Sequence, residues 1–135
     1  VSAGKYKVPL KGRFNKTILE REPEFKNKIG YLYFVKLFFD SEVFFKVGIT
    51  SKDIETRLKN LNYEEICSYK NKLISCYELE QKILNRYHSN RIQDNRLIGI
   101  DGYTEILNLN DTEIAEIKQI IEKAENHKNL NDERT

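Results

Sequence analysis

The most apolar stretches of the chain lie close together in its first half. "GYLYFVKLFF" (30–39) is a continuous run of aromatic and aliphatic residues, and "VFFKVGIT" (43–50) follows it after three polar residues. Short continuous apolar runs that are rich in aromatic and β-branched residues are typical of buried β-strands. The polar residues "DSE" (40–42) predict a turn, so we expect the two strands to form an antiparallel hairpin.

The pattern changes to a helical period after the second strand. Ile54, Leu58 and Leu61 are spaced i, i+4 and i+7, which places them on one face of a helix. Thr50 or Ser51 is expected to cap its start. The chain therefore passes from the hairpin directly into a helix.

A second amphipathic helix is predicted in "SCYELEQKILNRYHSNR" (75–91), starting near Cys76. Ser75 and Glu78 have the spacing of a capping box. Between the two helices we expect a third strand, near residues 66–69 or 73–74. The apolar stripe of the second helix consists of Cys76, Ile83, Leu84 and Tyr87.

The last third of the chain predicts one more strand and one more helix. "DGYTEILNL" (101–109) is typical of a turn and a short strand, and "NDTEIAEIKQIIEKAE" (110–125) is typical of a capped amphipathic helix. The final "HKNLNDERT" (127–135) is expected to be frayed. The inward positions of this helix are Ile114, Ile117, Ile121 and Ala124.

The order of these elements predicts an α+β domain, in which a small antiparallel sheet of about three strands is flanked by helices. The chain has 135 residues, enough for one domain with its own core. We place that domain at residues 29–126, between a basic N-terminal arm (1–28) and a frayed tail (127–135). The arm contains both prolines and shows little periodicity.

Charge is distributed unevenly along the chain. Residues 1–28 contain eight Lys or Arg and three Glu, a net charge of +5, although the whole chain has a net charge of only +2. A basic arm beside a neutral domain is typical of nucleic-acid binding, and a solvated flexible end explains the charge equally well. If the arm binds DNA, the contacts are expected from Lys5, Lys7, Lys11, Arg13 and Lys16.

Composition excludes several other classes of protein. No run approaches the roughly 20 apolar residues of a membrane span, and no signal peptide is recognised, so we expect a cytoplasmic protein without a membrane partner. Cys67 and Cys76 match no metal spacing and are interpreted as reduced thiols. No Gly-rich phosphate loop, HExxH motif or nucleophile elbow is present. Any metal should therefore be a hard cation bound by carboxylate oxygen.

Glu80 is the most informative polar position, because it lies within the apolar stripe of the second helix, whereas Glu78 points to nearly the opposite side. An unpaired buried carboxylate costs several kcal/mol, so Glu80 should have a cation partner. That partner is either a metal ion or an arginine in a structural ion pair. The pattern alone leaves both alternatives open.

Other polar residues are ambiguous when taken singly. Arg57 lies at the edge of its helical stripe, where a surface ion pair is common. Tyr31 and Tyr33 share one face of their strand, where tyrosines usually pack in a core. Lys46 interrupts an apolar strand, as lysines of edge strands do. His88 is expected to be solvated.

Taken together, these segments resemble the GIY-YIG nuclease superfamily, in particular its phage and bacterial branch with a K-[IV]-G-I-T second motif. "GYLYFV" resembles the first motif and "KVGIT" the second, with Lys46 in place of the tyrosine of other branches. "ELEQKIL" resembles the helix that carries the metal-binding glutamate, and "GYTEIL" resembles the closing segment. Arg57 follows Gly48 by nine residues, close to the position of the family's catalytic arginine.

The resemblance implies a catalytic site and a cofactor. One Mg²⁺ or Mn²⁺ per site would be bound by Glu80, and Arg57 would bind non-bridging phosphate oxygens. A phenol such as that of Tyr33 is a poor base unless a cation such as Lys46 stabilises its ionised form. The implied catalytic residues are Tyr33, Lys46, Arg57 and Glu80. Tyr31, His88 and Glu105 are the implied accessory residues.

The sequence therefore predicts a metal-dependent endonuclease that hydrolyses phosphodiester bonds in DNA. Two alternatives remain open: a non-catalytic nucleic-acid-binding module on the same fold, and an endonuclease that cuts RNA.

Overall fold

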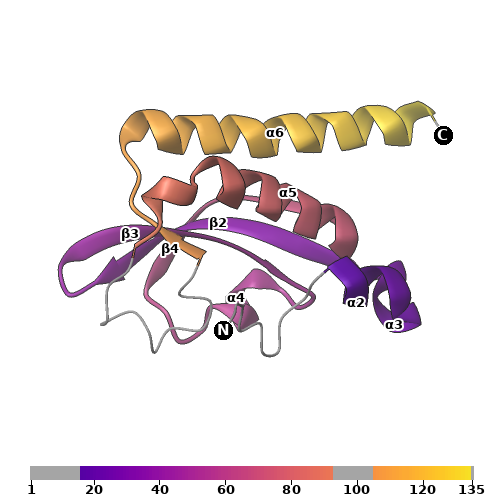
Figure 1. Ribbon diagram of the computed structural model, residues 1–135, viewed down its shortest axis with the longest axis horizontal. Helices are drawn as coiled ribbons and strands as arrows, with labels where there is room; N and C mark the ends of the chain where they lie inside the picture. The colour runs from indigo at the N-terminus through magenta and orange to yellow at the C-terminus, as the bar shows by residue number, and fades with distance from the viewer. Residues whose placement is uncertain (1–15, 93–104, 135) are drawn as a thin grey trace.

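An antiparallel sheet of four strands forms the centre of the molecule, in the order β4-β2-β3-β5 (Figure 1). The computed structural model describes residues 16–92 and 105–134. The predicted α+β class with a small antiparallel sheet is confirmed, with the two-residue β5 as a fourth strand. The strands are β2 (Ile29–Phe39), β3 (Glu42–Thr50), β4 (Tyr63–Lys72) and β5 (Ile106–Leu107). The helices are α2 (Lys16–Arg21), α3 (Pro23–Lys26), α4 (Ile54–Arg57), α5 (Leu73–Arg86), the 3-10 helix η1 (His88–Asn90) and α6 (Asp111–Arg134).

The predicted hairpin is present, and its turn has two residues. Asp40 and Ser41 have φ angles of 50° and 68°, a left-handed pair that matches the twist of the flanking strands. Glu42 was expected in the turn but already pairs with Phe39 as the first residue of β3. This register decides which side chains of β2 and β3 share a face of the sheet.

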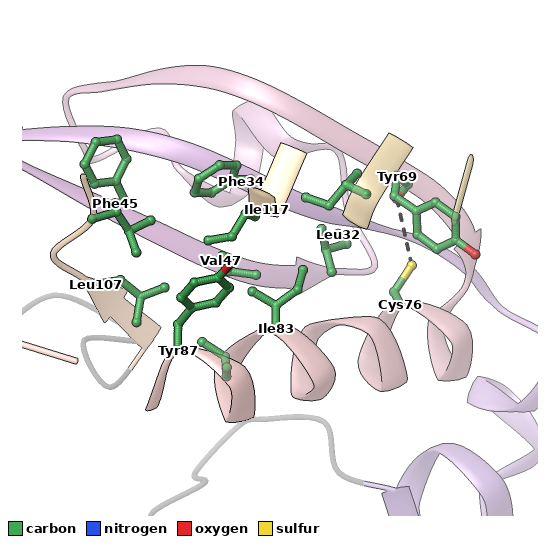
Figure 2. Packing of buried hydrophobic residues seen from close by; sticks show 13 residues of the cluster. Leu32, Phe34, Phe45, Val47, Tyr69, Cys76, Ile83, Tyr87, Leu107 and Ile117 are labelled. Carbon is green, nitrogen blue, oxygen red and sulfur yellow. Dashed lines mark hydrogen bonds between the residues drawn. The ribbon is translucent and has the colours of Figure 1, made fainter. Parts of the chain in front are cut away.

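Helices α5 and α6 cover one face of the sheet (Figure 1). Leu32 and Phe34 of β2 point to this face and pack with Val47, Ile83 and Ile117 (Figure 2). The apolar stripe predicted for α5 is confirmed, because its four residues are all buried. This face holds the larger of the two apolar clusters and fixes α5 against β2.

The opposite face of the sheet is covered by a second cluster. Tyr33 and Val35, which alternate with the residues of the first face, pack there with Phe44, Leu58 and Ile106. Leu58 directly follows α4, so α4 lies on this side of the sheet (Figure 1). The sheet therefore has packed helical elements on both faces.

The start of α4 differs from its prediction. Asp53, not Thr50 or Ser51, caps α4: its carboxylate accepts the Thr56 backbone N–H at 2.7 Å. The helix has only four residues, ending at Arg57.

The expected capping box of Ser75 and Glu78 is wrong, because α5 begins at Leu73, directly after β4. The Leu73 N–H donates a hydrogen bond to the Lys28 carbonyl oxygen at 2.8 Å, and α5 starts without a side-chain cap. Residues 66–69 lie in β4, as one of the two strand alternatives predicted.

The segment before β2 is more regular than expected. Residues 16–28 were expected to belong to an irregular arm, but they contain α2 and α3. Leu19 of α2 is only 1% exposed, so α2 contributes to the packed structure. Only residues 1–15 of the expected arm lie outside the described residues.

Helix α6 begins as predicted and ends later. The Glu113 N–H donates to Asn110 Oδ1 at 2.8 Å, and the Asn110 N–H donates to Glu113 Oε1 at 2.9 Å. The expected frayed tail is helical as far as Arg134. Lys128 in this part donates to the Lys70 carbonyl of β4 at 2.7 Å, which attaches the extension to the sheet.

Candidate active site

Lys46 is completely buried in the middle of β3, an unusual position for an ammonium group. Its Nζ donates to the Tyr33 hydroxyl oxygen at 3.0 Å and to Glu105 Oε1 at 2.9 Å. Burial by itself lowers the pKa of Lys46, but Glu105 and Tyr33 together outweigh this effect and the pKa lies above its ordinary value. The ammonium is therefore held in its charged form between an acid and a phenol.

Gly48 provides the space into which the Tyr33 side chain extends. The two residues are paired across β2 and β3. A Cβ at Gly48 would overlap the Tyr33 hydroxyl oxygen and would lie 3.1 Å from Lys46 Nζ. The missing side chain thus allows the phenol to cross β3 and reach the ammonium.

Glu80 lies on the buried side of α5 and is 3% exposed, as its place in the apolar stripe predicted. Its Oε1 accepts a hydrogen bond from Gln81 Nε2 at 3.1 Å. Its Oε2 is buried and receives no hydrogen bond from the residues that the structure describes. Burial raises the pKa of Glu80 well above its ordinary value and the adjacent Glu105 carboxylate raises it further, while Lys46 acts in the opposite direction.

Glu105 connects the two halves of this cluster. It directly precedes β5 and is 9% exposed. Its carboxylate is paired with Lys46 and also lies close enough to Glu80 to affect the pKa of that group. Two ionised carboxylates offer each other no donor, so Glu80 Oε2 gains a partner only if a proton or a cation lies beside it.

The charges of these three side chains do not balance. Lys46 contributes one positive charge, whereas Glu80 and Glu105 together contribute two negative charges when ionised. A buried excess of negative charge is unfavourable unless it is neutralised. The cluster is therefore chemically suited to bind one additional proton or one cation.

A comparison of the sequence with known families identifies the domain. The family model described as the T5orf172 domain matches residues 30–125. The chain belongs to the T5orf172 domain family. This domain occurs in phage and bacterial proteins that resemble nucleases, including proteins associated with the GIY-YIG group. No curated protein and no solved structure is significantly similar to the chain.

The T5orf172 match includes every residue of the buried cluster and also Arg57. Arg57 is the last residue of α4 and is half-buried. Its neighbours Ile54 and Leu58 pack into the same cluster as Tyr33. The T5orf172 fold thus brings Arg57 to the Tyr33 face of the sheet.

The other two residues predicted to be accessory, Tyr31 and His88, lie in different parts of the structure. Tyr31 is half-buried on the same face of β2 as Tyr33, and Lys70 Nζ lies 5.9 Å from the centre of its ring. His88 is exposed in η1. Among the described contacts, none joins His88 to the buried cluster, and its accessory role stays a prediction.

The lysines and arginine expected to bind DNA lie mainly beyond the described part of the chain. Lys16 begins α2, but its side chain is not described. The other four, which lie outside the described residues, are Lys5, Lys7, Lys11 and Arg13.

The cysteines do not contribute to this site. Both are free thiols, and burial raises the pKa of Cys67 to about 11 and that of Cys76 to about 12. A thiol that retains its proton is neither a good nucleophile nor a good metal ligand. Within residues 16–92 and 105–134, no three His, Cys, Asp or Glu side chains form a metal cluster. No helix in the same ranges is both long and apolar enough to span a membrane.

Two relationships in the site were not predicted from the sequence. Glu105 was expected only as an accessory residue, not as the ion-pair partner of Lys46. The close approach of Gly48 to Tyr33 was not expected at all. The sequence signal for this close approach was the spacing of Lys46 and Gly48, which places both residues on one face of β3.

Proposed function

We propose that this protein is a metal-dependent endonuclease that hydrolyses phosphodiester bonds in DNA. Its family supports a nuclease-like role connected with nucleic acid. The observation that carries the more specific proposal is the contact of the Lys46 ammonium with the Tyr33 hydroxyl, beside two buried carboxylates. Buried groups with altered protonation are common in active sites.

In this proposal Tyr33 is the general base. Its oxygen accepts a hydrogen bond from Lys46, so the phenol's own proton points away from the ammonium and would pass to solvent water when the site opens. The adjacent ammonium would stabilise the resulting phenolate, which would take a proton from the attacking water. Glu105 would act as a positioning residue, because it holds Lys46 charged and directed at Tyr33.

Arg57 would bind the phosphate that is attacked. A guanidinium presents several donors in a fixed plane and can contact two phosphate oxygens at once. The place of Arg57 on the Tyr33 side of the sheet agrees with this role. The positive charge would also favour the transition state, in which negative charge accumulates on the phosphate oxygens.

The carboxylates fit a hard divalent cation such as Mg²⁺ or Mn²⁺. Glu80 Oε2 is buried and accepts no hydrogen bond from a described donor, and ionisation of Glu80 beside Glu105 would leave the cluster with one negative charge in excess. Glu80 would bind the ion, since Mg²⁺ keeps several of its waters and needs few protein ligands. When bound, such an ion polarises the phosphate and stabilises the leaving oxygen.

The cluster is closed to solvent in this conformation. Tyr33 and Lys46 have no exposed surface, so a phosphodiester can reach the phenol only after the site opens. The same burial favours the rival function, a non-catalytic nucleic-acid-binding module in which the cluster serves the fold. An RNA endonuclease would use the same groups, since they contact the phosphodiester rather than the base.

A cleavage assay distinguishes these functions. The protein would be incubated with supercoiled plasmid, single-stranded DNA and RNA in Mg²⁺, in Mn²⁺ and in EDTA. We expect metal-dependent cleavage of DNA that is lost in Tyr33→Phe and retained in Tyr77→Phe, a control on α5. Binding of DNA without cleavage under every condition would contradict the enzyme assignment, and cleavage of RNA alone would contradict the choice of substrate.

A further inference from the structure

We propose that the DNA backbone leaves the Tyr33 site over the end of the sheet that carries Lys70 and Lys72, and not over the hairpin end. This inference rests on the proposed function and adds the direction in which the substrate lies. It assigns a DNA-binding role to lysines within the folded domain, separate from the basic residues that precede α2.

The two ends of the sheet have opposite charge. Residues 28–31, 48–52 and 68–72 form the end of the three long strands nearest to Tyr33, and they contain four lysines and no Asp or Glu. The hairpin end, residues 36–42 and 63–65, contains four carboxylates and one lysine. The four lysines are Lys28, Lys52, Lys70 and Lys72, and all are exposed. A polyanion that contacts Tyr33 would be attracted to the first end and repelled by the second.

The strand register places two of these lysines on the same face as Tyr33. Tyr31 pairs with Lys70, and Ile29 pairs with Lys72, in unbroken register with Tyr33. Residues two apart on a strand share a face and are separated by about 6.6 Å. Lys70 and Lys72 therefore occupy the first and second rows beyond Tyr33, at roughly 7 and 13 Å along the strand direction.

The position of Lys72 is unfavourable for helix stability. Lys72 is the N-cap residue of α5 and makes no side-chain capping hydrogen bond, and the first turn of α5 contains no acidic residue. The helix dipole favours anions at this end and disfavours cations. Lys72 therefore does not stabilise the start of α5, and its charge at this position suits the binding of a ligand with repeated negative charge.

The chemistry of this basic strip (Tyr31, Lys70 and Lys72) suits a phosphate backbone. Lysine ammonium groups on flexible stems contact phosphates as point charges, without reading base sequence. Lys70 also lies over the ring of Tyr31, so a cation and an aromatic face are presented together. Aromatic rings and cations in alternation are typical of surfaces that bind nucleic-acid strands.

The test is a measurement of DNA affinity as a function of salt concentration. A labelled DNA duplex would be titrated in EDTA, where cleavage is suppressed, with the parent protein and with the double variant Lys70→Gln/Lys72→Gln. The slope of log K against log[salt] should become shallower by about 1.8, because two phosphate contacts are lost. Lys118→Gln, on the exposed side of α6, is the matched control for loss of charge and should leave the slope unchanged.

The outcomes separate this inference from the proposed function. If the parent binds DNA and the double variant has the same slope as the control, the basic strip does not contact DNA and the inference fails, while the nuclease proposal stands. If the parent does not bind DNA at any salt concentration, the inference fails, and the cleavage assay in Mg²⁺ or Mn²⁺ decides the proposed function separately. A double variant that loses affinity but unfolds at a lower temperature than the control would also overturn the inference, since the lysines would then serve the fold.

Discussion

Lys46 lies opposite Val35 in the hairpin, and this pairing brings its ammonium to within 3.0 Å of the Tyr33 hydroxyl. A turn one residue longer would shift the register and move Lys46 to the α5 face. The positive φ angles of Asp40 and Ser41 are therefore connected, through the register, to the chemistry of a site several residue pairs away.

The ion pair of Lys46 and Glu105 should be strongly coupled. Lys46→Met should lower the free energy of unfolding by about 3–5 kcal/mol, because a buried carboxylate loses its partner. Adding Glu105→Gln should recover part of this loss, since no charge is then left unpaired. The measurement is urea unfolding of the two single variants and the double variant, with Lys36→Met on β2 as a control. Strictly additive effects would show that the pair contributes no coupling.

Gly48 should tolerate no side chain. Gly48→Ala places a methyl group against the Tyr33 hydroxyl, and we expect a loss of about 1–3 kcal/mol in stability together with loss of cleavage. Thermal unfolding and the plasmid assay would measure the two effects. Tyr33→Leu removes both atoms that a Cβ would overlap, the hydroxyl oxygen and Cζ, so Gly48→Ala should cost less stability in that background. An equal loss in both backgrounds would contradict the proposed contact.

Arg57→Lys should impair cleavage nearly as much as Arg57→Ala. Lysine keeps the charge but cannot contact two phosphate oxygens in one plane. Single-turnover cleavage at saturating DNA measures this effect separately from binding. If Arg57 forms only a structural ion pair, the lysine variant should instead cut at almost the parental rate, and the alanine variant should differ from it only in stability.

The two helices within residues 16–28 determine how a truncation should be designed. Deletion of residues 1–15 removes four positive charges and no negative charge, and it should leave the domain folded. Each lost phosphate contact should make the salt dependence of DNA binding shallower by about 0.9. Deletion of residues 1–26 also removes the buried Leu19, which should cost about 2–5 kcal/mol of stability. A parental salt slope after the shorter deletion would show that these charges do not contact DNA.

Sequence patterns predicted the parts of this structure that depend on local periodicity. The two hairpin strands, the inward face of α5 and the burial of Glu80 all follow from apolar spacing within one element. The resemblance to a nuclease family selected Tyr33 and Lys46 as candidates, and the structure places them in contact. Their roles in catalysis stay predictions.

The features that were missed depend on contacts between distant segments. Glu105 is 59 residues from Lys46 in the chain, so no local pattern predicts their ion pair. The start of α5 was misplaced because a backbone carbonyl, that of Lys28, satisfies the first N–H in place of a capping side chain. The sequence shows no helical pattern in the N-terminal segment because two helices of six and four residues are too short to show periodicity.

Glu80→Gln should change the pH dependence of stability, and Glu78→Gln should not. The pKa of the Glu80 carboxyl in the folded protein lies well above its ordinary value of 4.5. In the pH range just above 4.5, unfolding therefore releases the proton that the folded carboxyl holds. Rising pH therefore favours the unfolded state of the metal-free parent through this range, and the glutamine variant should lack this decline. At pH 8 in EDTA the variant should be at least as stable as the parent, since an uncompensated buried charge has been removed.

The same pair of variants tests the metal site, because glutamine removes the anionic ligand that a hard cation needs. Mg²⁺ or Mn²⁺ should raise the unfolding temperature of the parent and of Glu78→Gln, whose side chain is exposed, but not that of Glu80→Gln. Cleavage should follow the same division. An active Glu80→Gln protein would contradict the metal assignment. So would an inactive one that melts several degrees below the parent in EDTA, because Glu80 would then be half of a structural ion pair.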